Sequence, residues 1–201
     1  MNDALLIQHC SGNSPHINLL KITATKNLEY CMRHKFDFNM IINGERPVTG
    51  HWDAVRLVRE AMDLPYKYIV YLDADAIIVD MEHDLRKGCP EGKIGACRHI
   101  LTNPPFSMEL DHLNVGVLYY SNCQETRDFV DKWLDKFPGT PQPAWWEQGV
   151  MNDINDGTVV EIDAKYNSTF PVNHVENPVV SGFHGRGDVR TQFDLMVSQI
   201  K

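Results

Sequence analysis

Short apolar runs alternate with amphipathic stretches along most of the chain. Residues 4–10 form an apolar run that ends at Ser11-Gly12-Asn13, which predicts a buried strand followed by a turn. Within 51–62 the apolar side chains recur at helical spacing, which predicts an amphipathic helix. The same reasoning predicts further strands at 36–42, from 68 onward, and at 94–97, 115–120, 159–162 and 179–183. It predicts further helices through residue 32 and at 125–137, 147–154 and 188–200.

This alternation of strands and helices predicts an α/β fold with helices packed on a mostly parallel sheet. The chain has 201 residues, 43% of them hydrophobic, which is enough for one core. No repeat, low-complexity segment or linker divides it, so a single domain over residues 1–201 is expected.

The formal net charge of −8 argues against a nucleic-acid partner, because such proteins normally present a basic face. No segment has the length and composition of a membrane span or secretory signal. The five cysteines are odd in number and contain no CxxC pair, so reduced thiols are expected rather than a zinc site or disulfides. A cytoplasmic location follows; the Golgi lumen would require the sequence to be a trimmed piece of a longer protein.

The strongest chemical signal is the segment Tyr68 to Ala76, an apolar strand that runs into Asp73 and Asp75. Residues two apart on a strand share a face, so the two carboxylates are expected to point the same way. Like charges that close favour a cation between them. In open α/β sheets ligands bind at this carboxyl edge, so the pattern predicts a divalent metal that bridges the protein to a phosphate.

Three other segments carry polar groups where a strand or helix is expected to begin or end. Asn114 stands beside a glycine, Gly116, where a ligand can approach the backbone closely. Glu147 and Gln148 open a short helix with a carboxylate and an amide. The glycine-rich run 181–187 contains a histidine and an arginine.

Taken in order, these segments resemble glycosyltransferases of the GT-A type, and more narrowly the galactosyltransferase family that includes xyloglucan α-xylosyltransferases and fungal α-galactosyltransferases. The resemblance rests on the motifs at 72–76, 113–116, 147–148 and 181–185, and on Trp52 in the helix before the metal strand. It implies the GT-A fold, a Rossmann-like mixed and mostly parallel sheet flanked by helices.

The resemblance also implies roles for individual residues. Asp73, Asp75 and His184 would hold Mn²⁺ or Mg²⁺, with Asp73 also contacting the ribose. Asn114, Glu147 and Gln148 would face the transferred sugar and acceptor. The remaining residues expected at the nucleotide-sugar, a UDP-sugar by resemblance, are Gln8, His9, Cys10, Ser11, Ala74, Gly185 and Arg186.

The implied reaction moves a hexosyl or pentosyl group to a hydroxyl acceptor, such as a glycan, with retention of configuration. The metal would neutralise charge on the departing diphosphate, and Arg186 would add a second positive contact. Glu147 as a nucleophile or as an inverting base stays open.

The sequence departs from the family at Ala54, where members often carry lysine, and at Arg186, in place of late cysteines. These departures leave open a nucleotide-sugar-binding protein without transfer activity. A haloacid-dehalogenase-like phosphatase, with Asp73 as nucleophile and Mg²⁺ required, is the other enzymatic alternative. A purely structural α/β module would bind neither metal nor nucleotide.

Overall fold

The computed structural model describes residues 2–11, 16–43, 50–101, 110–137, 146–169, 172–183 and 189–199. Its larger sheet has six strands in the spatial order β2-β1-β3-β6-β5-β7. These are β1 (Ala4–Ser11), β2 (Phe36–Asn43), β3 (Tyr68–Asp73), β5 (Ile94–Leu101), β6 (Leu110–Ser121) and β7 (Val159–Ile162).

Only one strand of this sheet runs against the others. β1 pairs in parallel with β2 and β3, and β5 pairs in parallel with β7, whereas β6 is antiparallel to both β3 and β5. The sheet is therefore mixed and mostly parallel, as the sequence predicts.

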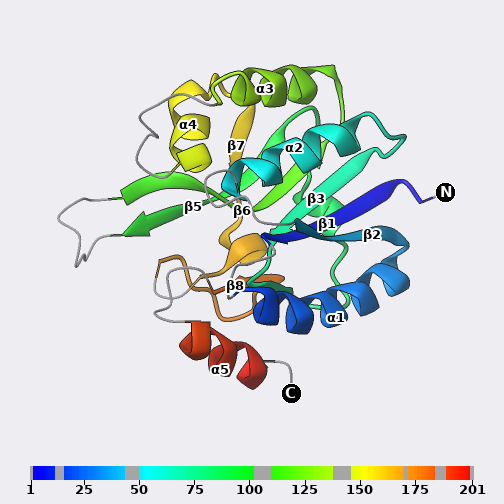
Figure 1. Cartoon of the computed structure of the whole chain (residues 1–201), viewed down its shortest axis with the longest axis vertical. Coiled ribbons are helices and arrows are strands. Elements are labelled where there is room, and N and C mark those ends of the chain that lie inside the picture. The colour runs from blue at the N-terminus through cyan, green and yellow to red at the C-terminus, as the bar shows by residue number, and fades with distance from the viewer. Residues whose placement is uncertain are drawn as a thin grey trace.

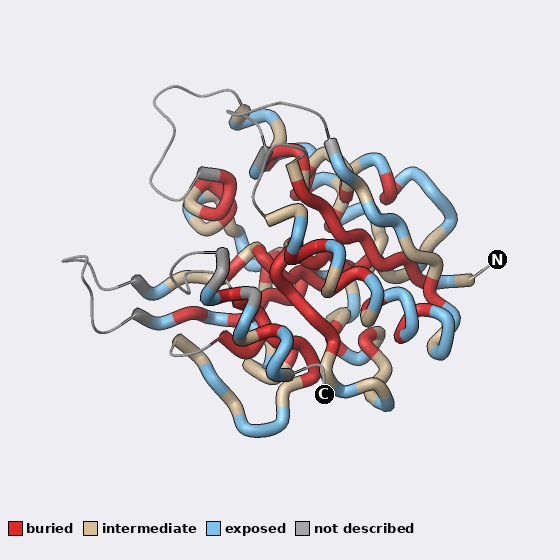
Figure 2. The backbone as a smooth tube through the Cα atoms, turned by 60° about the horizontal axis from the view of Figure 1, so that its bottom comes forward, coloured by how far each residue is buried: buried red, intermediate tan, exposed pale blue. Residues whose placement is uncertain are grey.

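Helices cover both faces of the sheet, with α2, α3 and α4 on one side and α1 and α5 on the other (Figure 1). Their bounds are α1 (Ile17–His34), α2 (Gly50–Met62), α3 (Gln124–Leu134), α4 (Trp146–Ile154) and α5 (Val189–Gln199). The structure also has two short 3₁₀ helices, η1 (Leu85–Gly88) and η2 (Ala164–Asn167). Burial is concentrated in the central strands, while exposed residues lie on the outer helical surfaces (Figure 2).

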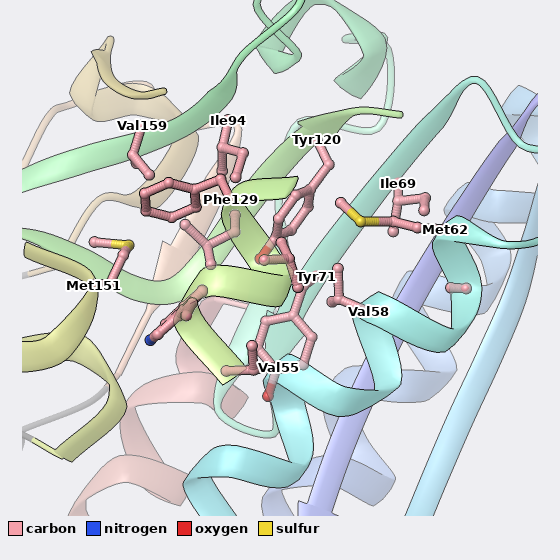
Figure 3. Packing of buried hydrophobic residues seen from close by; sticks show 14 of the residues in the cluster. Val55, Val58, Met62, Ile69, Tyr71, Ile94, Tyr120, Phe129, Met151 and Val159 are labelled. Carbon is pink, nitrogen blue, oxygen red and sulfur yellow. The ribbon is translucent and has the colours of Figure 1, made fainter. Parts of the chain in front are cut away.

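Alternate residues of each central strand enter different cores. Leu5, Ile69 and Tyr71 belong to the cluster under α2, α3 and α4, whereas Leu6 and Val70 belong to the cluster under α1. In the first cluster Tyr71 and Tyr120 reach from the sheet toward apolar side chains of the helices (Figure 3). A two-sided core of this kind explains why the strands read as continuous apolar runs in the sequence.

A second, two-stranded sheet joins the middle of the chain to its late part. β4 (Ala76–Ile78) pairs antiparallel with β8 (Val180–Gly182). Ser168 forms a bridge to Ser181, so the segment after η2 is also tied to β8.

Most predicted elements are confirmed, including a strand at 159–162 with unchanged bounds. Two expectations need correction. Asn114 and Gly116 do not precede a strand, because β6 begins at Leu110 and runs through both. The strand carrying the aspartates ends at Asp73, and residues 74 and 75 form a turn before β4. No helix among the described residues is both long and apolar enough to cross a bilayer.

Candidate active site

The polar residues singled out in the sequence that the structure describes lie at one edge of the large sheet. β1 and β3 are neighbours that end together, with His9 paired in register to Asp73. The chain moves to one side of β1 to form β2 and to the other side to form β3, so this edge lies at a topological switch point. Because β6 runs the opposite way, its beginning lies at the same edge: Val117 pairs with Leu72, and Asn114 lies farther along in that direction.

Asp73 is oriented by a tyrosine that shares its strand face. The Tyr71 hydroxyl donates a hydrogen bond to Asp73 Oδ1 at 2.9 Å. Burial, followed by the charge of Asp73, raises the pKa of Tyr71 well above its ordinary value, so the phenol keeps its proton. The result is a half-buried carboxylate with one oxygen held in place.

Asp75 lies in the turn and is only 6% exposed. The alternation of a strand therefore does not explain how its side chain is placed relative to Asp73, contrary to the sequence argument. Its backbone carbonyl accepts a hydrogen bond from the N–H of Phe183 at 3.2 Å. Phe183 directly precedes His184 in the chain, so the described backbone ties the Asp-x-Asp turn to the start of the glycine-rich motif.

Gln8 is placed differently from the expectation of contact with the nucleotide. It is fully buried. Its amide donates to Thr23 Oγ1 at 2.8 Å and to the carbonyl oxygens of Asp73 and Ala76 at 3.0 and 3.2 Å. A side chain with no exposure and these partners holds the protein backbone, because no surface is left for a ligand.

The next three residues, His9, Cys10 and Ser11, differ from Gln8 in their exposure and surroundings. His9 is 6% exposed on the α2 side of the sheet, and burial lowers its pKa while nearby Asp53 acts in the opposite direction. Cys10 is buried, and Ser11 at the strand end is half-buried. Of the four residues predicted on this strand, Ser11 alone keeps substantial exposure.

Glu147 is the most perturbed acid of the site. It is 8% exposed in the first turn of α4, and its backbone carbonyl accepts a hydrogen bond from the Trp133 indole N–H at 2.9 Å. Its Oε1 lies 3.8 Å from His51 Nδ1, and its Oε2 has no hydrogen-bond partner within the described part of the chain. Burial, with a smaller contribution from the charge of Asp73, raises the pKa of Glu147 to about 8. The carboxyl group is therefore largely protonated at neutral pH, and its Oε2 is a buried polar atom that no described residue satisfies.

Gln148, by contrast, is engaged on both ends of its amide. Its Oε1 accepts from Asn114 Nδ2 at 3.0 Å and from the Val115 N–H at 3.2 Å. Its Nε2 lies 2.8 Å from His112 Nε2, and Asn114 Oδ1 accepts in turn from Asn167 at 2.9 Å. The structure thus brings together Asn114 and Gln148, two of the three predicted catalytic residues, in one buried hydrogen-bonded network.

Three predicted residues, His184, Gly185 and Arg186, lie outside the described residues. Within the described ranges, no three histidine, cysteine or acidic side chains come together as a metal site. The donors that are described, Asp73 and Asp75, are nevertheless hard carboxylates of the kind that Mn²⁺ and Mg²⁺ bind. Their chemistry and their place at the switch point fit a divalent cation.

Several residues of this region were not predicted from the sequence. Tyr71 was detectable, because it lies two positions before Asp73 and so shares its strand face. Thr23 and Asn27 lie one helical turn apart on α1, but only the fold shows that they face the Asp-x-Asp turn. His112 had no local signal, because its contact with Gln148 spans 36 positions.

Comparison with protein families gives one match within the chain. Residues 4–90 match the model of the galactosyl transferase GMA12/MNN10 family. Galactomannan galactosyltransferase 1 of Cyamopsis tetragonoloba is 24% identical over 145 residues, which cover 68% of this chain and 32% of that protein. Probable glycosyltransferase 6 of Oryza sativa subsp. indica is 29% identical over 158 residues, 74% of this chain and 31% of that protein. The chain thus spans about a third of the length of these curated relatives.

Solved structures of low sequence identity share the fold. A glycosyltransferase involved in the glycosylation of the major capsid of PBCV-1 superposes with a TM-score of 0.72 at 13% identity, covering 96% of this chain and 99% of that one. A galactosyltransferase in complex with donor and acceptor sugar analogues superposes with a TM-score of 0.60 at 13% identity, covering 96% and 95%. These findings confirm the GT-A fold and the glycosyltransferase resemblance that the sequence predicts.

Proposed function

We propose that the chain is a metal-dependent glycosyltransferase that moves a sugar from a nucleoside-diphosphate donor, UDP-sugar by resemblance, to a hydroxyl acceptor. The observation that carries the proposal is the meeting of Asp73, Asp75 and the buried acid Glu147 at the switch-point edge. The family match over residues 4–90 and the shared fold support this reading over the phosphatase alternative.

In this proposal Asp73 and Asp75 hold Mn²⁺ or Mg²⁺, with His184 as a third ligand and Arg186 as a further contact to the diphosphate. A cation bound there supplies neutralisation of the negative charge that develops on the leaving diphosphate. Tyr71 keeps Asp73 in a single orientation through its 2.9 Å hydrogen bond, so the carboxylate is set before the ligand arrives.

Glu147 is the residue of this edge best suited to touch the transferred sugar. Its protonated carboxyl group has both a hydrogen to donate and an unpaired buried oxygen, which suit a sugar hydroxyl. Gln148 and Asn114 would support the site without contacting the sugar, because their amides are hydrogen-bonded to each other and Gln148 is also bonded to the backbone of β6. We propose retention of configuration, with the leaving phosphate oxygen accepting the proton of the acceptor hydroxyl. The anomeric proton of the first-formed product, observed by NMR, tests this assignment against inversion by Glu147.

Thermal unfolding with UDP, GDP or CDP, in the presence of Mn²⁺, Mg²⁺ or EDTA, tests the donor site. A ligand that binds the folded state at 100 times its Kd stabilises it by about 2.7 kcal/mol. We expect a rise in Tm with UDP that requires Mn²⁺ and is lost in Asp75→Ala. Asp63→Ala, which removes an exposed carboxylate at the end of α2, is the matched control and keeps the shift.

No shift with any nucleotide in the unmodified protein would reject the proposed donor site. A shift without turnover of any UDP-sugar would instead favour the binding protein without transfer activity. A covalent phosphate on Asp73 after incubation with a phosphate ester would establish the phosphatase alternative.

A further inference from the structure

Three buried polar side chains lie behind the Asp-x-Asp turn, on the side of the sheet opposite Glu147. Gln8 comes from β1, and Thr23 and Asn27 come from successive turns of α1. All three have no exposure to solvent. Side chains with these polar groups are rarely buried so completely unless each polar atom has a partner.

Their partners are the backbone groups of the turn itself. The carbonyl oxygens of residues 73, 74 and 76 accept hydrogen bonds from Gln8, Thr23 and Asn27, at distances from 2.9 to 3.2 Å. The N–H of Ile78 donates to Asn27 Oδ1 at 2.9 Å. Four backbone groups at and beside the turn, three carbonyl oxygens and one N–H, are thus held by side chains.

The three side chains are also bonded to one another. Gln8 Nε2 donates to Thr23 Oγ1 at 2.8 Å, and Asn27 Nδ2 donates to Gln8 Oε1 at 3.1 Å. The Asn27 bond fixes which end of the Gln8 amide faces the turn. Thr23 Oγ1 also lies 3.2 and 3.3 Å from the carbonyl oxygens of Leu19 and Leu20, and its shortest contact as a donor is the one to Ala74. A buried, connected network of this kind favours one conformation of the turn that it contacts.

We propose that Gln8, Thr23 and Asn27 form a brace that sets the conformation of the turn between β3 and β4, and thereby positions Asp73 and Asp75 for a divalent cation. This inference rests on the proposed metal-dependent function. The three are positioning residues, since they reach the carboxylates only through the backbone that carries them.

Thr23→Val tests the brace, because valine keeps the shape of threonine and removes the hydroxyl that donates to Ala74. Thr23→Ser restores the hydroxyl. Thr126→Val is the matched control: Thr126 is also fully buried, and its hydroxyl donates to the Ser121 carbonyl at 2.7 Å, far along the chain from the turn. The readouts are Mn²⁺ affinity by calorimetry in the presence of UDP, and hydrogen exchange of the backbone amides of residues 74–78 without metal.

Residues that orient metal ligands typically change metal affinity by 10–100-fold when they are removed. We expect Thr23→Val to weaken Mn²⁺ binding at least tenfold and to speed exchange at 74–78. Thr23→Ser is expected to stay within twofold of the unmodified protein in both readouts. Thr126→Val is expected to lower the Tm while leaving both readouts unchanged.

Two results would overturn the brace while leaving the proposed function intact: Mn²⁺ affinity of Thr23→Val within twofold of the unmodified protein, or an equal loss in Thr126→Val. Should Thr23→Val not fold, Asn27→Ser takes its place with the same criteria. Absence of Mn²⁺ binding in the unmodified protein would reject the proposed function, and with it the role of the brace in metal binding.

Discussion

Glu147→Gln is expected to stabilise the metal-free protein increasingly as the pH rises. The pKa of Glu147 is raised from 4.5 to about 8, mainly by burial. The folded state therefore holds a proton that the unfolded chain releases between these values. Stability from this group is fully present below pH 4.5 and is lost as the pH rises through 8, whereas a glutamine at this position has no proton to lose.

The size of the effect follows from the two pKa values. Their separation corresponds to about 5 kcal/mol of unfolding free energy, and about 4 kcal/mol of it falls between pH 5 and pH 9. For a chain of this length, 1 kcal/mol shifts the Tm by about 2–4 °C. The variant should thus gain on the order of 10 °C over the unmodified protein across this range, although it lacks the acid that we assign to the sugar.

Urea unfolding in EDTA at steps from pH 5 to pH 9 measures this difference directly. Taking the difference between two proteins removes the contributions of other titrating groups, His9 among them. Glu60→Gln is the control, because it makes the same chemical change at an exposed position of α2. A flat difference curve for Glu147→Gln would refute the reasoning that burial keeps this acid protonated.

Three further predictions concern the surroundings of the site. Tyr71→Phe removes the hydrogen bond to Asp73, so we expect Mn²⁺ affinity to fall about tenfold in a calorimetric titration, with the fold retained in the far-UV circular dichroism spectrum. Gln148→Glu places a carboxylate against His112 Nε2, so an NMR titration should show the His112 pKa, now lowered by burial, rise in the variant; an unchanged value would contradict the 2.8 Å contact. Gly95→Ala would bring a Cβ atom to 2.7 Å from a backbone carbonyl oxygen, so urea unfolding should show a loss of about 1–3 kcal/mol.

The sequence predicts the layers of this fold well, because each strand or helix shows a local pattern of apolar and polar positions. The strands at 4–11 and 68–73 are buried on both faces and read as apolar runs, and the helix at 50–62 shows its apolar stripe. The pairing of two strands that lie far apart in the sequence produces no such local pattern. The small sheet joins residues 76–78 to 180–182, and nothing near either segment indicates the other.

The residues of the candidate site likewise include some whose role can be inferred from the sequence and others whose role only the fold shows. Asp73 and Glu147 are charged residues at element ends, where function is a reasonable inference from sequence. Gln8 is a polar residue inside an apolar run, and that pattern does not distinguish a ligand contact from a buried hydrogen bond. The family resemblance implies the ligand contact, whereas the structure shows hydrogen bonds of Gln8 with Thr23 and Asn27 of α1.

The pairing of β4 with β8 also affects the order in which the protein can be completed during synthesis. The large sheet needs residues up to about 162, but the Asp-x-Asp turn gains its backbone contacts with β8 only when residues 180–183 have left the ribosome. Contacts of such long sequence separation form late, because a long loop must close first. A nascent chain can therefore bury most of its core before the turn between β3 and β4 gains its backbone contacts with β8.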